Sequence, residues 1–215
     1  MALKEFNLLI KMNDGKISIA QADKMFKKAY ELAYESRAKV KPWDEIFDLW
    51  FRAASNGHIR AQFYTGVCYD HGLGVEKDNQ KAFDWYLQAA NNGKMEAQFN
   101  IGFFYFNGEL VKQDFEKAVH WYTLAAKKGD TEAQRDLGRC YIYGEGVKQD
   151  YAKAIYWYKK AAAKDDNKAL YNLGLCYEFG DGVNQSIRWA KYYFEKASAL
   201  KHRKATYKLK KLNMK

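Results

Sequence analysis

A period of 36 residues runs through most of the chain and constrains its fold more than any other feature. Glycine, alanine and tyrosine each recur in this step, as does an Ala-Ala pair: Gly66, Gly102, Gly138 and Gly174; Ala61, Ala97, Ala133 and Ala169; Tyr69, Tyr105, Tyr141 and Tyr177; Ala53-Ala54, Ala89-Ala90, Ala125-Ala126 and Ala161-Ala162. Self-similarity at a period of about 20 to 50 residues is typical of proteins that stack one supersecondary unit repeatedly. The period therefore predicts a repeat protein.

Each period is predicted to form two short helices. In one unit Asp114 can accept hydrogen bonds from free backbone N–H groups and so cap a first helix, and Gly129 can end it in a left-handed conformation. Gly144 and Gly146 form the turn that follows the second helix. Apolar residues follow at helical spacing on both segments: Ala118, Tyr122, Ala125 and Ala126, then Ala133, Leu137, Cys140 and Tyr141. One such pair cannot bury its apolar face alone, so the pairs must stack.

The third unit reads KAVHWYTLAAKKGDTEAQRDLGRCYIYGEGV from Lys117 to Val147. This closely resembles the pattern of the Sel-one-like repeat (SLR) family, K-A-x-x-W-Y-x-x-A-A-x-x-G-x-x-x-A-Q-x-x-L-G-x-x-Y-x-x-G-x-G-V, whose members are related to the tetratricopeptide helix-pair solenoids. The resemblance covers about Trp43 to Leu212. It implies an all-α fold, a right-handed α-α superhelical solenoid of 36-residue helix-turn-helix repeats.

The chain departs from the family pattern at a few positions. Leu110 replaces the second glycine of its loop, so we expect a different turn there. Asp165 stands where the earlier units have a glycine between the two helices, and Ser186 replaces the capping aspartate. Ile46 and Leu49 stand where later units have alanine and tryptophan, as expected for a unit near an end.

The limits of the pattern predict three segments. Residues 1–42 are expected to form an N-terminal helical cap, residues 43–186 four helix-pair repeats, and residues 187–215 a degenerate repeat with a basic capping helix. The boundary at Lys41-Pro42 follows because the residue before proline avoids helical geometry.

Within the cap, Ser18 and Gln21 form a capping box, with Ile17 available as a hydrophobic staple. They predict an amphipathic helix from Ala20 to Ala38. Before it, a helix from Ala2 to Asn13 is favoured over a hairpin that turns at Asn13-Asp14-Gly15, and both remain open.

The net charge of +10 is concentrated near the C-terminus, where Lys201 to Lys215 hold seven basic residues and no acidic ones. Such a tail can bind nucleic acid or an anionic membrane surface, although it is more often a polar cap on the last helix. No stretch of about 18 apolar residues is present, so no membrane span is expected. The N-terminus lacks the pattern of a signal peptide, which favours a cytoplasmic location.

Residues that could carry chemistry are better explained by packing. Cys68 and His71 could supply two metal ligands, but a zinc site needs three or four. Cys68, Cys140 and Cys176 share one repeat position that holds Phe104 in another unit, which indicates reduced, buried thiols of a cytoplasmic protein. The glycine loops lack the strand and the Lys-Ser/Thr of a phosphate-binding loop. We therefore expect no enzymatic activity, no catalytic residue, no metal and no cofactor.

Aromatic residues recur beside the core alanines and could be mistaken for a nucleobase-stacking stripe. We interpret the tyrosines as core residues and the tryptophans as half-exposed residues at its edge. The residues concerned are Trp85, Trp121 and Trp157, beside Tyr86, Tyr122 and Tyr158.

The variable outward positions of the first helices remain as a recognition surface. With Ala82 and Tyr86 turned inward, a rotation of roughly 100° per residue turns other positions outward. The family resemblance implies that these helices line a concave groove. The candidate partner-binding residues are Asp84, Gln88, Asn91, His120, Lys127, Tyr156, Lys159, Lys160, Tyr192 and Lys196.

The candidate surface becomes more basic toward its C-terminal end, so it favours an acidic protein or peptide as the partner. The predicted function is a non-catalytic protein–protein interaction scaffold or adaptor that binds a partner in the groove. The alternative is a nucleic-acid-binding accessory protein that uses the basic C-terminal helix, and we consider nucleic acid the weaker candidate.

Overall fold

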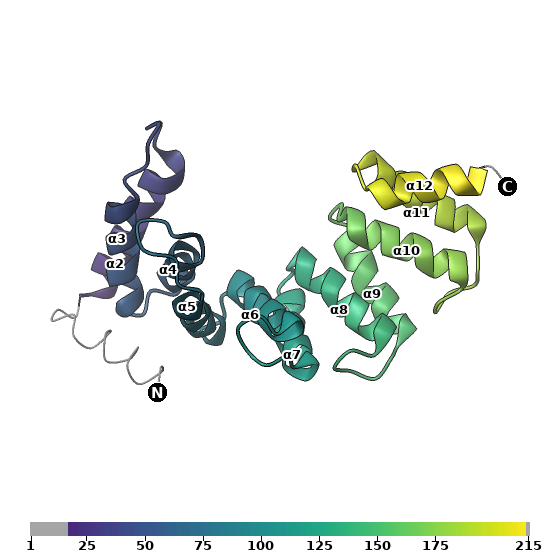
Figure 1. Cartoon of the computed structure of the whole chain (residues 1–215), viewed down its shortest axis with the longest axis horizontal. Coiled ribbons are helices and arrows are strands. Elements are labelled where there is room, and N and C mark those ends of the chain that lie inside the picture. The colour runs from purple at the N-terminus through teal and green to yellow at the C-terminus, as the bar shows by residue number, and fades with distance from the viewer. Residues whose placement is uncertain (1–16, 214–215) are drawn as a thin grey trace. The chain divides into compact units, whose positions relative to one another are not determined.

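The computed structural model describes residues 17–213, and within that range all regular secondary structure is helical (Figure 1). The chain divides into two compact units, residues 1–101 and 102–215. The first unit holds α2 (Ile19–Tyr30), a π-helical segment (Glu31–Glu35), α3 (Trp43–Ser55), α4 (Ile59–His71) and α5 (Asn79–Asn91), and α6 (Met95–Asn107) spans the division. The second unit holds α7 (Phe115–Lys127), α8 (Thr131–Tyr143), α9 (Tyr151–Ala162), α10 (Asn167–Phe179), α11 (Ile187–Ala199) and α12 (Arg203–Asn213).

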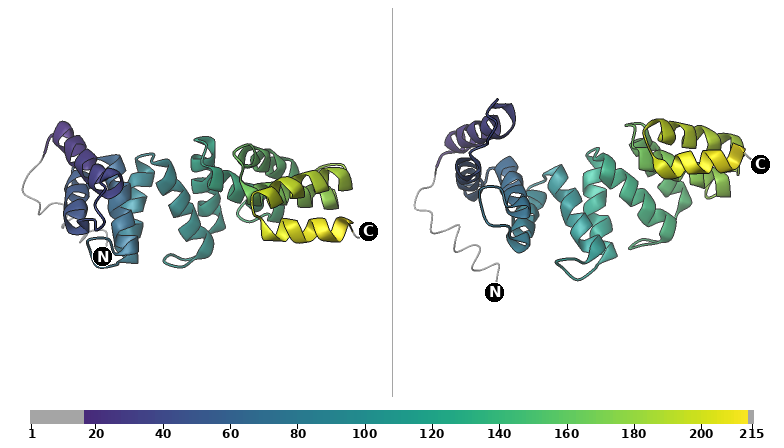
Figure 2. Two further views of the ribbon diagram at one scale, coloured as in Figure 1. Left: turned by 90° about the horizontal axis from the view of Figure 1, so that it is seen from above. Right: turned by 45° about the horizontal axis from the view of Figure 1, so that its top comes forward.

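Helices of the second unit pack as consecutive pairs, and α12 lies beside α11 in the further views of Figure 2. One core cluster centred on Tyr158 and Leu173 joins α9 to α10. The next cluster, around Leu170 and Phe194, joins α10 to α11 and includes the fully buried Ala205 of α12. The predicted all-α solenoid of stacked helix pairs is confirmed.

From α5 onward, the first helix of each pair begins at a side-chain cap, as the spacing predicted, whereas α3 begins after Pro42 without one. Asp114 and Asp150 each accept a hydrogen bond from the backbone N–H three residues later, at 2.9 Å. Ser186 makes the equivalent bond with the Trp189 N–H at 3.3 Å, so serine replaces the aspartate without loss of the cap. These bonds satisfy N–H groups that a helix cannot pair internally.

Loop glycines allow the backbone to approach the start of each pair closely. Gly146 has φ +72°, and a Cβ atom there would collide with the carbonyl oxygen of Phe115. Leu110 occupies the equivalent position in the preceding loop. Among the described non-glycine residues only Asp165 and Lys201 have positive φ, so Leu110 adopts a different conformation. The predicted change of turn is confirmed.

The N-terminal cap is partly different from its prediction. The capping box of Ser18 and Gln21 is present, but the α-helix ends at Tyr30 and a π-helical segment continues to Glu35, short of the predicted Ala38. The Ser36 N–H bonds the Glu31 carbonyl oxygen at 2.7 Å, and Ser36 itself is extended with ψ 137°, which stops the helix. The helix or hairpin expected before residue 16 lies outside the described residues.

Burial of the tryptophans also differs from the prediction. Trp85 is fully buried, with Phe51 of α3 packed edge-on at a centroid distance of 5.8 Å. Trp121 and Trp157 are partly exposed, as expected. Within residues 17–213, none of the helices combines the length and the apolar character that a membrane span requires.

Candidate partner-binding surface

The predicted partner-binding residues fall in both units. Asp84, Gln88 and Asn91 lie on α5 of the first unit. The other seven lie on three first helices of the second unit: His120, Lys127, Tyr156, Lys159, Lys160, Tyr192 and Lys196. The two groups are therefore treated as separate surfaces.

The prediction that Asp84 faces outward is wrong. Its side chain is buried, at 7% exposure, and its Oδ1 accepts a hydrogen bond from Gln80 Nε2 at 3.2 Å. All five residues from Ala82 to Tyr86 are buried, so α5 is enclosed on more than one face at this turn. Burial raises the pKa of the Asp84 carboxyl. Gln88 is partly buried and Asn91 is exposed.

All seven candidate residues of the second unit are exposed, as predicted. Two tyrosine–lysine pairs stand out among them. Lys160 Nζ lies 4.9 Å from the ring centroid of Tyr156 on α9, and Lys196 Nζ lies 4.9 Å from that of Tyr192 on α11. In each pair the lysine follows the tyrosine by four residues on the same helix, and the second pair lies 36 residues after the first. The same cation–aromatic arrangement is thus presented twice at one repeat position.

Neighbouring aromatic rings support both tyrosines. Trp157 contacts Tyr156 edge-on at a centroid distance of 4.9 Å, and Tyr193 contacts Tyr192 edge-on at 5.2 Å. Tyr193 also packs against the core cluster of α9 and α10. The rings of Tyr156 and Tyr192 therefore each rest against a neighbouring aromatic side chain, while they remain 51% and 39% exposed.

Lys196 is the lysine of this surface whose charge the structure reinforces. A hydrogen bond with Tyr192 raises the pKa of the exposed Lys196 ammonium group above its ordinary value. Within the described residues, no ion pair involves Lys127, Lys159, Lys160 or Lys196. The surface can therefore attract an anionic ligand without first breaking an internal ion pair.

Trp189 belongs to this surface and was missed from the sequence. It is 49% exposed and contacts Tyr192 edge-on at 5.4 Å. The equivalent positions in earlier units hold Lys81, Lys117 and Lys153, each with Nζ over a repeat tyrosine ring. The change from this repeated lysine to tryptophan in the last unit was the sequence signal that could have identified Trp189.

Cysteine and histidine side chains offer no reactive arrangement among the described residues. Cys68 is fully buried while His71 of the same helix is exposed, so the two do not face a common site. Burial raises the pKa of the Cys68, Cys140 and Cys176 thiols to about 12, which keeps them protonated and weakly nucleophilic. No group of three or more metal-ligating side chains occurs in the described part of the chain.

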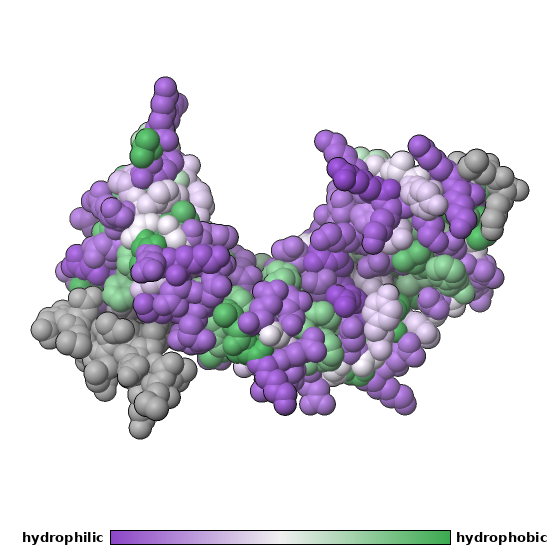
Figure 3. Space-filling model, viewed as in Figure 1, coloured by the Kyte–Doolittle hydropathy of each residue, from purple (hydrophilic) through white to green (hydrophobic). Residues whose placement is uncertain are grey.

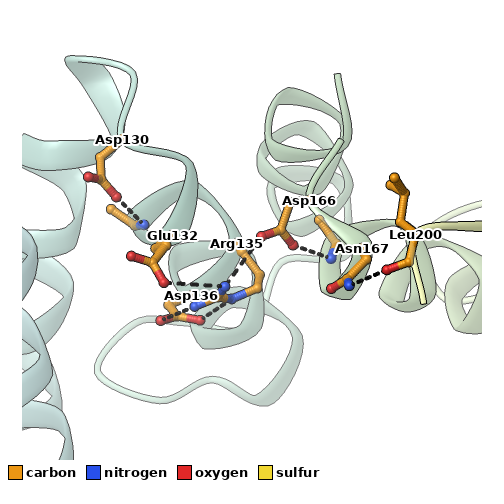
Figure 4. A network of polar contacts seen from close by, with 9 residues as sticks. Asp130, Glu132, Arg135, Asp136, Asp166, Asn167 and Leu200 are labelled. Carbon is orange, nitrogen blue, oxygen red and sulfur yellow. Dashed lines mark hydrogen bonds and ion pairs between the residues drawn. The ribbon is translucent and has the colours of Figure 1, made fainter. Parts of the chain in front are cut away.

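An ion cluster around Arg135 joins α8 to the start of α10 (Figure 4). The guanidinium bonds both carboxylate oxygens of Asp136, at 2.8 and 3.0 Å, and lies 3.3 Å from Asp166 Oδ2. The other oxygen of Asp166 caps α10 by accepting from the Ala169 N–H at 2.6 Å. Because the Arg135 side chain is only 11% exposed and fully paired, we interpret the cluster as structural.

Comparison with known proteins identifies the repeat. The Sel1 repeat model matches residues 59–94, 96–130, 131–166 and 167–202, which together make up more than half of the chain. Each match begins near a second helix, half a unit away from the pairs described above. No curated protein matches the chain.

Solved structures show the same architecture. A Sel1 repeat protein from Oxalobacter formigenes is 31% identical with a TM-score of 0.79, over 90% of this chain and 79% of that one. A protective antigen present in uropathogenic Escherichia coli strains, displaying an SLR fold, is 29% identical with a TM-score of 0.80, over 90% of this chain and 43% of that one. The chain thus spans less than half the length of the antigen. An immunity protein from Pseudomonas aeruginosa is 24% identical with a TM-score of 0.53, over 91% of this chain and 74% of that one. At this identity the likeness concerns the fold and not the function.

Sel1 repeat proteins generally act in protein–protein interaction, and the family is generally non-enzymatic. The fourfold match, the stacked helix pairs and the caps at equivalent positions all agree. The chain belongs to the Sel1 repeat family.

Proposed function

We propose that the chain is a non-catalytic scaffold or adaptor that binds an acidic segment, or a C-terminal carboxylate, of a partner protein. The binding site is the Tyr–Lys surface, formed by His120, Lys127, Tyr156, Lys159, Lys160, Tyr192 and Lys196. The observation that carries the proposal is the tyrosine–lysine pair repeated on α9 and α11. The surface lies on first helices, which line the concave side in the resembled family.

The two residue types contribute differently to binding. Lysines without an ion partner attract an acidic segment and set the association rate, which falls as salt rises. A half-exposed tyrosine on a packed base offers a rigid amphipathic contact, a type enriched in binding hot spots. We expect the tyrosines mainly to slow dissociation.

The proposed location is the cytoplasm. The cysteines Cys68, Cys140 and Cys176 are free and buried in this structure. Reduced thiols at core positions suit a reducing compartment.

Nucleic-acid binding through α12 is the second candidate. Arg203, Lys204, Lys210 and Lys211 on α12 are exposed. However, Ala205 of α12 is fully buried, and Lys208 Nζ pairs with Glu178 Oε2 of α10 at 2.7 Å. These contacts favour a capping helix over a free basic arm. Binding of a labelled duplex or RNA across a salt series tests the alternative, because phosphate contacts produce a steep salt dependence.

The proposed surface is tested with a partner identified by affinity purification and mass spectrometry. The double variant Lys159→Glu/Lys160→Glu should weaken partner binding and leave the melting temperature unchanged, because both side chains are exposed. Lys112→Glu/Lys148→Glu is a matched control, since it changes charge equally at two exposed loop lysines. Normal binding by the first variant, together with loss of binding when exposed second-helix residues are changed, would place the function on the opposite face.

A further inference from the structure

A pocket of about 270 Å³ lies in the second unit between the C-terminal turns of α8 and α10 and the start of α9. Its wall includes Tyr143 and Phe179, which are 67% and 62% exposed, and Tyr151. Hydrophobic surface is visible beside α10 in Figure 3. Asp181 is the one charged residue among the described residues that line the pocket. None of these residues belongs to the Tyr–Lys surface.

The preceding repeat shows what the equivalent space holds one unit earlier. There the guanidinium carbon of Arg139 lies 4.5 Å from the ring centroid of Phe106. One guanidinium nitrogen lies 3.4 Å from Glu145 Oε1. A cation from within the chain is thus placed between an aromatic ring and a carboxylate.

The pocket keeps the carboxylate of this arrangement but has neither the cation nor the ring at the equivalent positions. A step of 36 residues converts Glu145 into Asp181, Arg139 into Leu175 and Phe106 into Ile142. Leu175 and Ile142 both line the pocket, and its aromatic rings come from other positions, Tyr143 and Tyr151 among them. Leucine is shorter than arginine and carries no charge. Among the described residues, no ion pair or side-chain hydrogen bond to the Asp181 carboxylate is present.

The following repeat restores an internal cation. Lys208 of α12 lies with Nζ 5.2 Å from the ring centroid of Phe179 and 2.7 Å from Glu178 Oε2. A cation, a ring and a carboxylate thus also meet at Phe179 of the pocket wall, but the carboxylate there is Glu178 and not Asp181. Beside Asp181, no side chain of the described residues supplies such a cation, while Tyr143 and Tyr151 add aromatic rings to the same pocket.

We propose that this pocket binds an arginine side chain of a partner protein. The guanidinium occupies the place that Arg139 fills one unit earlier. It donates hydrogen bonds to the Asp181 carboxylate, and its planar face lies against the ring of Tyr143 or Tyr151. Arginine is favoured over lysine because its flat, weakly hydrated head stacks on aromatic rings while it bonds a carboxylate. This site does not depend on the function proposed for the Tyr–Lys surface.

The test uses two neutral-ended probes, N-acetylarginine amide and its uncharged isostere N-acetylcitrulline amide, titrated into the full chain and followed by NMR. We expect saturable shifts at Tyr143 and Asp181, with a dissociation constant of roughly 1–50 mM for the arginine probe. The citrulline probe should bind at least about fivefold more weakly, because a charge-assisted hydrogen bond is lost. Asp181→Asn should remove most of this preference.

A second variant fills the pocket from within. Leu175→Arg recreates the residue of the preceding unit and should abolish probe binding while the melting temperature is kept. Glu195→Gln removes an exposed carboxylate on α11 and should leave probe binding unchanged, as should Lys159→Glu/Lys160→Glu. Equal affinity for the two probes, or undiminished arginine binding by Asp181→Asn, would overturn the proposal. Because Asp181→Asn changes a partly exposed side chain, it decides the matter even if Leu175→Arg fails to fold.

Discussion

A Cβ atom placed on Gly138 of α8 would lie 2.7 Å from the ring of Tyr158 on α9. The same relationship joins Gly102 to Tyr122 within the second unit, and Gly66 to Tyr86 within the first. In each case the glycine of one pair receives the aromatic ring of the next pair. The repeated glycine therefore sets how closely successive pairs stack.

Replacing Gly138 should destabilise the protein although alanine and leucine favour helices. The Tyr158 ring is almost fully buried and has little room to move, so Gly138→Ala should cost about 1–3 kcal/mol and Gly138→Leu more. Thermal unfolding measures the loss. Ala152→Leu, at an exposed position of α9, is the control and should change stability by less than about 0.5 kcal/mol. An unchanged melting temperature for Gly138→Leu would contradict the packing described here.

Glycine should stabilise the two turns where another residue has positive φ. The position between the helices of a pair has φ +86°, +85° and +100° at Gly57, Gly93 and Gly129. Asp165 and Lys201 occupy it with φ 59° and 62°, a conformation that costs an L-residue roughly 1 kcal/mol.

The variants Asp165→Gly and Lys201→Gly should therefore raise the free energy of unfolding by about 0.5–1 kcal/mol, with the larger gain at lysine. Chemical denaturation measures the change. Gly129→Ala is the reverse control and should lower stability. A loss of stability in both glycine variants would show that the side chains of Asp165 and Lys201 stabilise the protein by more than their backbone conformation costs.

Stability should fall as the pH drops below about 6.5, because histidine caps two helices. His58 and His202 accept hydrogen bonds at Nδ1 from the N–H groups of Ala61 and Ala205, at 3.0 and 3.2 Å. A nitrogen that accepts must be unprotonated. Burial is the main cause that lowers the pKa of both histidines in the folded state.

The unfolded chain therefore binds protons at a higher pH than the folded chain. The contribution of each histidine cap to the free energy of unfolding is present above about pH 6.5. It is lost as the pH falls toward the lower pKa of the histidine in the folded state. We expect about 0.5–1 kcal/mol from each cap. Asp166 caps α10 at the position equivalent to His202, so His202→Asp should keep the cap and flatten the stability profile between pH 7 and 5. An identical pH profile in this variant would exclude His202 as a source.

Removal of α12 should expose the last core cluster. Truncation after Leu200 uncovers apolar side chains of α10 and α11, including Leu170 and Phe194. A stacked array needs a polar outer cap to stay in solution as a monomer. Light scattering after size exclusion should then detect association. A truncated protein that stays monomeric and equally stable would make the basic tail an independent arm and would favour the nucleic-acid alternative.

Local features could be predicted from the sequence because they depend on few neighbouring residues. The period, the helix pairs, the cap at Ser186 and the changed turn at Leu110 follow from capping and backbone preferences alone. The exposure of the seven candidate residues on α7, α9 and α11 followed from helical rotation. A strict repeat makes such reasoning dependable, since each unit has nearly the same surroundings.

Features that depend on neighbouring helices were decided only by the tertiary structure. Asp84 and Trp85 are buried because α5 is enclosed on more than one face, and a helical wheel contains no information about that enclosure. The pocket beside Leu175 exists because residues from α8, α9 and α10 meet there. The sequence by itself determined the unit, its ends and its inward face, through local spacing. Packing between units determined which outward positions remain exposed, because burial is a property of neighbours that are distant in sequence.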